Sequence, residues 1–380
     1  MRNLFTSESV SEGHPDKICD QISDAILDEI LKQDPNAKVA CETFATTNYL
    51  LIGGQITTTA KVDYEAIARD VLRKIGYNND DYGINAETCK IDIKIEGQSP
   101  DIALGIDLNA QTIGAGDQGI MFGYATNESK TYLPLAITLS HELVYTATKL
   151  RKNKEFKWAR PDMKSQVTID YTNKNKPVID TILMSIQHDE NFNEQEFKTY
   201  VKKHIMDKVA LDFGLNTDFK VLINPTGKFV IGGPQGDTGL TGRKIIVDTY
   251  GGYARHGGGA FSGKDSTKVD RSAAYMARYA AKNLVAAGLA DKLEIQVSYA
   301  IGKPEPVSIF VETFKTNHVN QKIIEQALLE NFSFSVIDMI TNLKLREPVF
   351  LKTATYGHFG KDHFAWEELD KVPLLKKYLK

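Results

Sequence analysis

The sequence is poor in cysteine and carries no strong charge of either sign. Its three cysteines, Cys19, Cys41 and Cys89, are odd in number and form no C-x-x-C pair. This pattern argues against a disulfide or zinc framework, fits a reducing compartment, and predicts three buried thiols. The formal net charge of -3 gives no general basic field that would attract nucleic acid or an anionic membrane. We therefore expect neither partner, and a polyanion would need a local cluster of cations.

Long apolar runs are also missing. No stretch of about 18 apolar residues occurs, and the first twenty residues lack the apolar core of a signal peptide. We therefore expect a cytoplasmic protein. The apolar content of 42% over 380 residues is enough to bury more than one core, so two or three globular domains are expected.

Three similar series of helices and strands follow one another along the chain. The first reads as helix 16–34, strands 38–47 and 49–59, helix 63–75 and strand 89–96; the second as helix 136–150, strands 166–171 and 178–187, helix 193–209 and strands within 219–231; the third as helix 269–287, strands 293–301 and 307–313, and a helix from about 319. The second helices begin near positions 63, 193 and 318, at spacings of 130 and 125 residues. This periodicity predicts an α/β (α+β) protein of three repeats, which we divide as 1–110, 111–232 and 233–380.

The first predicted helix has a regular pattern and an unusual beginning. Isoleucines four residues apart predict one core-facing side, and the aspartates between them predict a solvent-facing side: Ile18, Ile22, Ile26, Ile30, Asp20, Asp24 and Asp28. Pro15 suits the first turn of this helix. His14 and Lys17 flank an N-terminus whose dipole is already positive, an arrangement that favours a bound anion.

Two glycine-rich segments, 97–123 and 232–263, contain sequences that match nucleotide-binding motifs only in part. Gly114–Gly119 matches G-x-G-x-x-G, but the residues that follow read as a strand where a dinucleotide fold needs a helix. Gly258–Lys264 matches a P-loop up to its lysine, but Asp265 stands where a P-loop has the magnesium-binding Ser or Thr. A P-loop kinase or phosphatase is therefore the weaker of the ATP-dependent alternatives.

Cations and acids gather around the second glycine-rich segment: Arg243, Lys244, Lys264, Lys268, Arg271, Asp265 and Asp270. Lys264 and Lys268 are four residues apart, which would place them on one face of a helix, and a bound anion would offset their repulsion. Glycine amides beside lysines and acids suit a polyphosphate with its cation.

The segments GAGDQGIMFGYA (114–125) and GGGAFSGKD (257–265) resemble the two signature segments of S-adenosylmethionine synthetases, and the resemblance runs from Leu4 to Gly360. It implies three similar α/β domains with pseudo-threefold symmetry. It also implies methionine adenosyltransferase activity, in which the methionine sulfur attacks C5′ of ATP and the released tripolyphosphate is hydrolysed to pyrophosphate and phosphate.

The same resemblance implies a set of site residues. The implied catalytic residues are His14, Lys164, Arg243 and Lys264; these four also contact ATP, together with Asp162, Lys228, Phe229, Asp237, Lys244 and Ala260. The implied methionine-binding residues are Gln55, Gln98, Asp117, Asp237 and Lys268. Asp16 and Asp270 match ligands of two Mg²⁺ ions per site and Glu42 matches a K⁺ ligand. The segment 98–109 matches a lid over the site.

Two positions depart from the family pattern. Gln55 stands where a glutamate commonly meets the substrate ammonium group, and Lys228 replaces an arginine. The resemblance implies a homodimer or homotetramer with sites between subunits, and the sequence leaves the choice between these two open. A catalytically silent homologue is a second alternative, which Gln55 favours and the retained lysines, arginine and aspartates oppose.

Overall fold

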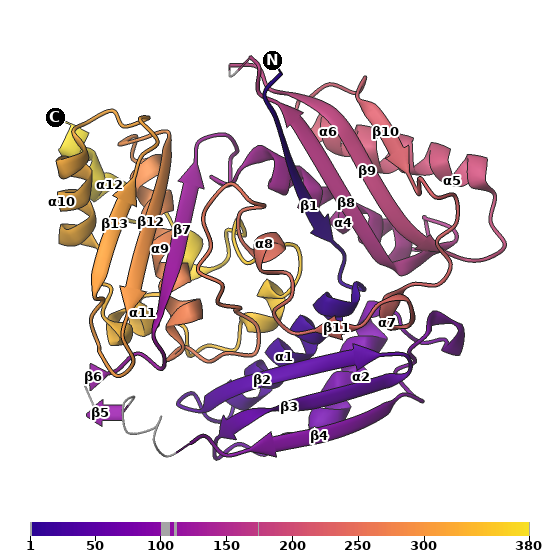
Figure 1. The fold of residues 1–380 in the computed structure, drawn as a ribbon, viewed down its shortest axis with the longest axis horizontal. Helices are drawn as coiled ribbons and strands as arrows, with labels where there is room; N and C mark the ends of the chain where they lie inside the picture. The colour runs from indigo at the N-terminus through magenta and orange to yellow at the C-terminus, as the bar shows by residue number, and fades with distance from the viewer. Residues whose placement is uncertain (1, 100–106, 110–111, 174, 380) are drawn as a thin grey trace.

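The computed structural model describes residues 2–99, 107–109, 112–173 and 175–379. Over these residues, three main β-sheets lie around the middle of the molecule, and helices pack against each of them (Figure 1). Each sheet contains one of the three predicted hairpins, and the order helix, hairpin, helix is repeated three times along the chain. The predicted α/β fold of three similar domains is confirmed.

The first sheet has the strand order β11-β2-β3-β4. Its elements are α1 Pro15–Leu31, β2 Lys38–Thr46, β3 Tyr49–Thr57, α2 Tyr64–Ile75, β4 Lys90–Glu96 and β11 Gly239–Leu240. Ile22 and Ile26 of α1 join Val39 of β2 and Ile52 of β3 in one buried core. Strand β4 returns parallel to β3 after α2, so the opposite face of the sheet is left open for a site.

The second sheet has the order β1-β8-β9-β10. Its elements are β1 Leu4–Val10, α4 Leu135–Lys152, β8 Ala159–Asp170, β9 Val178–His188, α5 Glu194–Tyr200, η2 Val201–Asp207, α6 Lys208–Asp212 and β10 Lys220–Ile223. Again an antiparallel hairpin is followed by a helix and a parallel strand. A separate core of this unit contains Leu139, Met163 and Ile182.

The third sheet has the order β13-β12-β7. Its elements are β7 Gly119–Thr126, α9 Val269–Ala286, β12 Lys292–Tyr299, β13 Ser308–Glu312 and α10 Gln321–Asn331. The shorter elements of the chain are η1 Asp80–Tyr82, β5 Asp107–Asn109, β6 Thr112–Ile113, α7 Gly233–Gly236, α8 Ile245–Asp248, α11 Val336–Asn342, η3 Phe350–Thr353, η4 Ala365–Glu367, α12 Val372–Leu375 and η5 Lys376–Leu379.

Each sheet takes one strand from a distant part of the chain. Strand β1 pairs with β8, β11 pairs with β2, and β7 pairs with β12, all antiparallel. The glycine-rich segments lead into β7 and surround β11, so this exchange brings them beside α1 and α9. The domain limits 1–110, 111–232 and 233–380 stay a prediction.

Three structural expectations need correction. The aspartates of α1 do not form a solvent-facing side, because Asp20, Asp24 and Asp28 are all buried and only Glu29 of this helix is partly exposed. Only residues Lys220–Ile223 of the segment 219–231 form a strand. The helix expected over 193–209 is interrupted by the π-helical turn η2, which apolar periodicity does not predict. The predicted burial of all three cysteines is confirmed.

Candidate active site

The N-terminus of α1 carries a buried, neutral histidine. His14 is the N-cap residue, and its Nδ1 accepts a hydrogen bond from the backbone N–H of Asp16 at 3.2 Å. Because Nδ1 accepts, the ring proton of the neutral form lies on Nε2. Burial, together with the charges of Lys244 and Lys164, lowers the pKa of His14 to about 2. Nε2 is therefore a neutral hydrogen-bond donor at physiological pH.

Asp16 connects α1 to the chain around β11. Its Oδ1 accepts from the backbone N–H of Leu240 at 3.0 Å, its Oδ2 pairs with the ammonium of Lys244, and Arg243 Nε lies 3.8 Å from Oδ1. The Lys244 side chain is 20% exposed and that of Arg243 is 49% exposed. Both cations can therefore turn toward a bound anion.

Strand β8 adds two further predicted residues. Asp162 is buried, its Oδ2 accepts from the backbone N–H of Gly233 at 2.9 Å, and its Oδ1 has no partner among the described residues. Burial raises the pKa of Asp162 to about 6, despite the hydrogen bond from Gly233 and the charge of Lys164. Lys164 is exposed and lies opposite Val10 of β1. A β-carbon on Gly13 would lie 2.4 Å from Pro161, so glycine allows this close approach of β8 to α1.

Three predicted ATP-binding residues lie after β10. Phe229 is half-buried and exchanges two backbone hydrogen bonds with His188, through the ring Nε2 and the backbone N–H of the histidine. Lys228 is exposed and its Nζ lies 3.3 Å from Glu190, a contact of two exposed groups that contributes little. Asp237 is exposed just after α7.

A second group of predicted residues lies at the start of α9. Lys264 Nζ lies 2.8 Å from Asp270 Oδ2, and Lys268 pairs with the buried Asp265. Lys268 is the N-cap residue of α9 and Lys264 precedes the helix, so the expectation that they share a helix face is wrong. A β-carbon on Gly259 would lie 2.3 Å from Asp270 Oδ1, which shows how closely the glycine loop follows this carboxylate.

Asp117 and Ala260 border this second group. Asp117 is exposed, and its Oδ1 accepts from the backbone N–H of Gln118 at 2.7 Å. A β-carbon on Gly242 would lie 2.6 Å from the Cβ of Ala260, so Ala260 adjoins the residue that precedes Arg243. The P-loop alternative fails here, because α9 does not begin until Val269, five residues after Lys264.

The open face of the first sheet holds a third group. A cavity of about 310 Å³ is lined there by residues that include Glu42, Phe44, Gln55 and Leu240. Glu42 and Gln55 are exposed on neighbouring strands, β2 and β3. Gln98 follows β4, and its backbone N–H donates to Thr57 Oγ1 at 3.0 Å. Most of the predicted lid, residues 100–106, lies outside the described residues.

We call the residues around the α1 N-terminus the α1 group (His14, Asp16, Asp162, Lys164, Arg243 and Lys244) and those at the start of α9 the α9 group (Lys264, Lys268 and Asp270). The carboxylate of Asp16 accepts from the N–H of Leu240, and that of Asp24 accepts from the N–H of Gly263. Asp24 is eight residues after Asp16 on α1, which corresponds to a rise of about 12 Å along the helix. On β2, Gly239 pairs with Ala45 and Lys264 pairs with Ala40, and these two positions are five residues, or about 17 Å, apart along the strand. The two groups therefore lie well apart along α1 and β2: the α1 group is at the start of α1, and the α9 group is beside its middle.

Sequence reasoning missed the buried residues that hold these groups. Asp24 pairs with Arg271 at 2.8 Å and accepts from the N–H of Gly263, while Asp20 accepts from the N–H of Gly242. Lys17, which the sequence places near a bound anion, instead pairs with two buried carboxylates of the chain, Asp20 and Asp248. The spacing of the aspartates was visible in the sequence, but their partners Gly242, Gly263 and Arg271 lie more than 200 residues away.

Comparison with known proteins decides the family. The chain matches the N-terminal domain of S-adenosylmethionine synthetase over residues 2–100, the central domain over 112–229 and the C-terminal domain over 231–368. It is 81% identical over 377 residues to the S-adenosylmethionine synthase of Mesoplasma florum, which covers 99% of this chain and 100% of that protein. The chain belongs to the S-adenosylmethionine synthetase family.

Two further relatives agree. The S-adenosylmethionine synthases of Mycoplasma capricolum and Mycoplasma mycoides are each 76% identical over 379 residues, covering 100% of this chain and 98% of those proteins. The enzyme class predicted from the sequence, methionine adenosyltransferase, is thereby confirmed. In the described part of the chain, no helix has the length and apolar character needed to cross a membrane.

The metal ligands implied by the family resemblance are single carboxylates. The described residues include no group of three or more His, Cys, Asp or Glu side chains arranged to hold a metal ion. Asp16 and Asp270 each offer a carboxylate oxygen whose partner is a lysine that is partly exposed, Lys244 and Lys264. One carboxylate with phosphate and water oxygens is a common way for proteins to bind Mg²⁺, so these residues fit such an ion.

Proposed function

We propose that this chain makes S-adenosylmethionine from ATP, L-methionine and water. The methionine sulfur forms a bond to C5′, and the C5′–O bond breaks with its electrons going to the tripolyphosphate. Water then cleaves the tripolyphosphate to pyrophosphate and phosphate. The observation that supports this best is the cluster of cations beside His14: Arg243 and Lys244 lie against Asp16, whose backbone N–H donates to His14, and their charges and that of Lys164 lower the pKa of His14.

The chemistry asks for charge stabilisation rather than for a base. A thioether has no proton to lose, so the barrier falls through alignment of the reactants and stabilisation of the departing oxygen. With Nδ1 occupied by the N–H of Asp16, His14 would donate from Nε2 to the departing oxygen. Lys164, Arg243 and Lys244 would hold the phosphates, with Lys264 arriving from the α9 group. Asp162, Lys228, Phe229, Asp237 and Ala260 would line the nucleotide.

Metal ions complete the proposed site. We assign two Mg²⁺ ions to Asp16 and Asp270 and one K⁺ ion to Glu42. Bound Mg²⁺ would neutralise phosphate charge and stabilise the leaving tripolyphosphate. Each lysine that now pairs with Asp16 or Asp270 would then turn to a phosphate oxygen.

The methionine site would use residues from the sheet face and the α9 group. We assign Gln55, Gln98, Asp117, Asp237 and Lys268 to methionine. The neutral Gln55 can accept only a neutral hydrogen bond from the substrate ammonium group, which is weaker than the charge-assisted bond of a glutamate. Methionine affinity is therefore where we expect this chain to differ from relatives with glutamate.

We further propose that two copies of the chain build each site. The α1 and α9 groups are about 12 Å apart along α1, and the sheet face between them is open and carries Glu42 and Gln55. A twofold axis over this face would bring the α1 group of one copy to the α9 group of the other. The assembly is a homodimer or a pair of dimers, in the cytoplasm, without a nucleic-acid or membrane partner.

The activity is tested by incubating the protein with ATP, methionine, Mg²⁺ and K⁺ and following S-adenosylmethionine, pyrophosphate and phosphate. Lys264→Ala should lower kcat by about 10² to 10³, the usual cost of removing one group that stabilises transition-state charge. Lys322→Ala, an exposed lysine on α10, is the matched control and should leave kcat unchanged. Release of ADP without S-adenosylmethionine would contradict the proposal, and no turnover at saturating methionine would favour the silent homologue.

The shared site has a separate test. Lys164→Ala and Lys264→Ala are each expected to be inactive alone, because one site residue is then missing from every site. In mixed dimers of the two variants, one site carries both substitutions and the other carries neither, so co-expression should restore about a quarter of the activity. If each site lay within one chain, mixing would restore nothing.

A further inference from the structure

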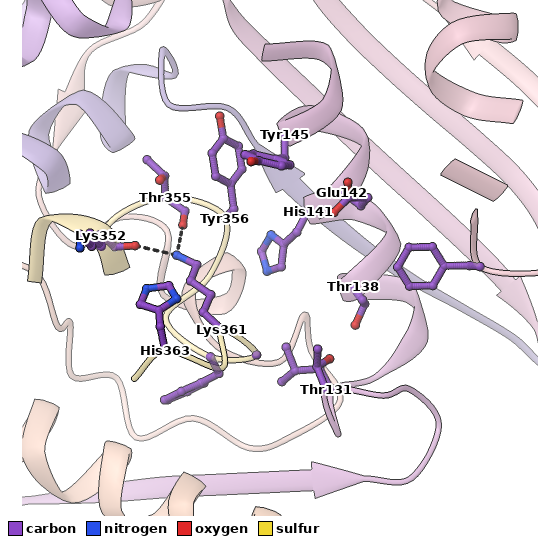
Figure 2. Close-up of a pocket in the computed structure, with 14 residues that line it drawn as sticks. Thr131, Thr138, His141, Glu142, Tyr145, Lys352, Thr355, Tyr356, Lys361 and His363 are labelled. Carbon is purple, nitrogen blue, oxygen red and sulfur yellow. Dashed lines mark hydrogen bonds between the residues drawn. The ribbon is translucent and has the colours of Figure 1, made fainter. Parts of the chain in front are cut away.

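A cavity of about 540 Å³ lies away from every residue assigned above (Figure 2). Helix α4 forms one side, the turn at Thr131 and Leu133 a second, and the segment from Lys352 to His363 a third. Small-molecule sites usually have volumes of this size. The proposed ATP and methionine residues do not line it, so it is a separate feature of the fold.

One side of the cavity carries a cation without an acidic partner. Lys361 Nζ donates to the backbone oxygens of Lys352 at 2.8 Å and Thr355 at 2.7 Å. No carboxylate of the described residues lies within 4 Å of it. An ammonium has three donors, so when Lys361 is protonated one donor remains free for a ligand. Burial and the charge of Lys17 together lower the pKa of Lys361 to about 7, against the opposing charges of Asp248 and Glu367, and a bound anion would favour the protonated form.

Near this cation is a buried polar atom that also has no partner. His141 is 8% exposed, its Nδ1 lies 2.7 Å from Ser9 Oγ, and its Nε2 makes no hydrogen bond within the described chain. Figure 2 shows the end of Lys361 directed to Lys352 and Thr355, with the His141 ring in the same cavity, and burial and the nearby charge of Lys361 lower the pKa of His141. A β-carbon at Gly357 would lie 2.7 Å from Nε2, so the glycine leaves this atom uncovered. In the tautomer in which Ser9 donates to Nδ1, Nε2 carries the proton and can donate to an acceptor in the cavity.

The cavity also has an apolar, partly aromatic wall, beside a polar part of the lining that includes Glu142, Thr138 and His363. Leu133, Phe213 and Phe359 line it, and Tyr145 lies edge-on to Tyr356 with ring centroids 5.3 Å apart. Tyr145 is 47% exposed and Phe213 is 37% exposed, so both stand at the entrance. Apolar walls around a few converging polar groups are typical of sites for organic molecules.

We propose that this cavity binds a small organic anion. Its carboxylate or phosphate group lies between Lys361 and His141, and its aromatic or aliphatic body lies against Tyr145 and Phe213. Such a ligand supplies the acceptors that the two polar groups lack, and it covers the aromatic side chains at the entrance. A phosphate without an apolar body would leave this wall exposed and is the poorer fit.

The test uses 1-anilinonaphthalene-8-sulfonate, a fluorescent aromatic anion, with the full-length protein and saturating tripolyphosphate to occupy the proposed active site. Lys361→Met keeps the apolar stem and removes the charge, so binding should weaken about tenfold, the size of a lost charge-assisted hydrogen bond. Glu142→Gln removes an acid that lines the same cavity and should strengthen binding. N-phenyl-1-naphthylamine, the neutral probe, should bind equally well to wild type and Lys361→Met.

Two additions make the outcome decisive. Tyr145→Ala changes a half-exposed side chain, so it should fold even if Lys361→Met does not, and it should weaken both probes. Benzoate and phenyl phosphate are then used as competitors, and the stronger one identifies the preferred head group. Equal affinity of the anionic probe for wild type and both weakened variants, absence of probe binding in saturating tripolyphosphate, or failure of both competitors to displace the probe would overturn the proposal.

Discussion

The ion pair between Asp24 and Arg271 should be a main support of both the fold and the α9 group. The two carboxylate oxygens accept from the guanidinium at 2.8 and 3.0 Å, and both side chains are at most 1% exposed. Asp24 also holds the N–H of Gly263, while Arg271 donates to the backbone oxygen of Lys264 at 3.2 Å. The pair therefore connects α1 and α9 and fixes the residue that should contact the phosphates.

Asp24→Asn keeps the side-chain shape and removes the charge. The guanidinium of Arg271 is then buried without a counter-charge, which costs about 3 to 5 kcal/mol. Glu29→Gln is the matched control on the same helix. Glu29 pairs with Lys32 at 2.7 Å, but the two side chains are 39% and 55% exposed, so its loss should cost at most about 1 kcal/mol.

The free energy of unfolding is measured by urea titration, with circular dichroism as the signal. The double variant Asp24→Asn with Arg271→Met should recover part of the loss, because no unpaired charge then remains. The activity of Asp24→Asn should also fall, since Lys264 is no longer fixed. A cost for Asp24→Asn as small as that of Glu29→Gln would refute this reasoning.

Three further predictions concern substrate, pH and packing. Gln55→Glu should lower the KM for methionine about fivefold with little change in kcat, because about 1 kcal/mol of charge-assisted binding is restored, and initial rates of S-adenosylmethionine formation measure it. Burial lowers the pKa of His141 to about 3, so between pH 6.5 and 3 the unfolded state binds a proton that the folded state does not. The contribution of His141 to the free energy of unfolding therefore falls by about 1.4 kcal/mol per pH unit as the pH drops through this range. Urea titrations at pH 7.5 and 5 should show a smaller loss of this free energy for His141→Gln than for wild type. Gly123→Ala places a β-carbon 2.1 Å from the backbone of Ala277 and should destabilise the chain by about 1 to 3 kcal/mol, whereas Gly97→Ala meets nothing within 4 Å and should have little effect.

The regular elements were predictable because their signals are local. The isoleucine spacing of α1, the hairpin runs around residue 48 and the acid at Asp63 that caps α2 all depend on neighbours within a few positions. The exchanged strand β1 was not predicted, since its pairing with β8 depends on residues about 160 positions away. Its sequence, LFTSESV, has no clear strand alternation by itself.

The site residues were predictable as types and segments but not as an arrangement. The glycine loops and their lysines were visible, and the strand reading of the residues after Gly119 is confirmed by β7. The aspartates of α1 were assigned to solvent, because four-residue spacing alone cannot distinguish an exposed acid from one with a distant partner. Asp28 shows the reason: it accepts from the N–H groups of Phe350 and Leu351, more than 300 residues away.

The four aspartates of α1 also explain why the proposed metal site falls at the first of them. Asp20, Asp24 and Asp28 are held by Lys17, Arg271 and two backbone N–H groups, all in the interior. Asp16 alone among these four has a partly exposed cation, Lys244, as its closest charged partner. A phosphate can draw this lysine away and leave a carboxylate oxygen for Mg²⁺ without unpairing a buried charge. The same exchange at Asp24 would leave Arg271 uncompensated in the core, at a cost of several kcal/mol.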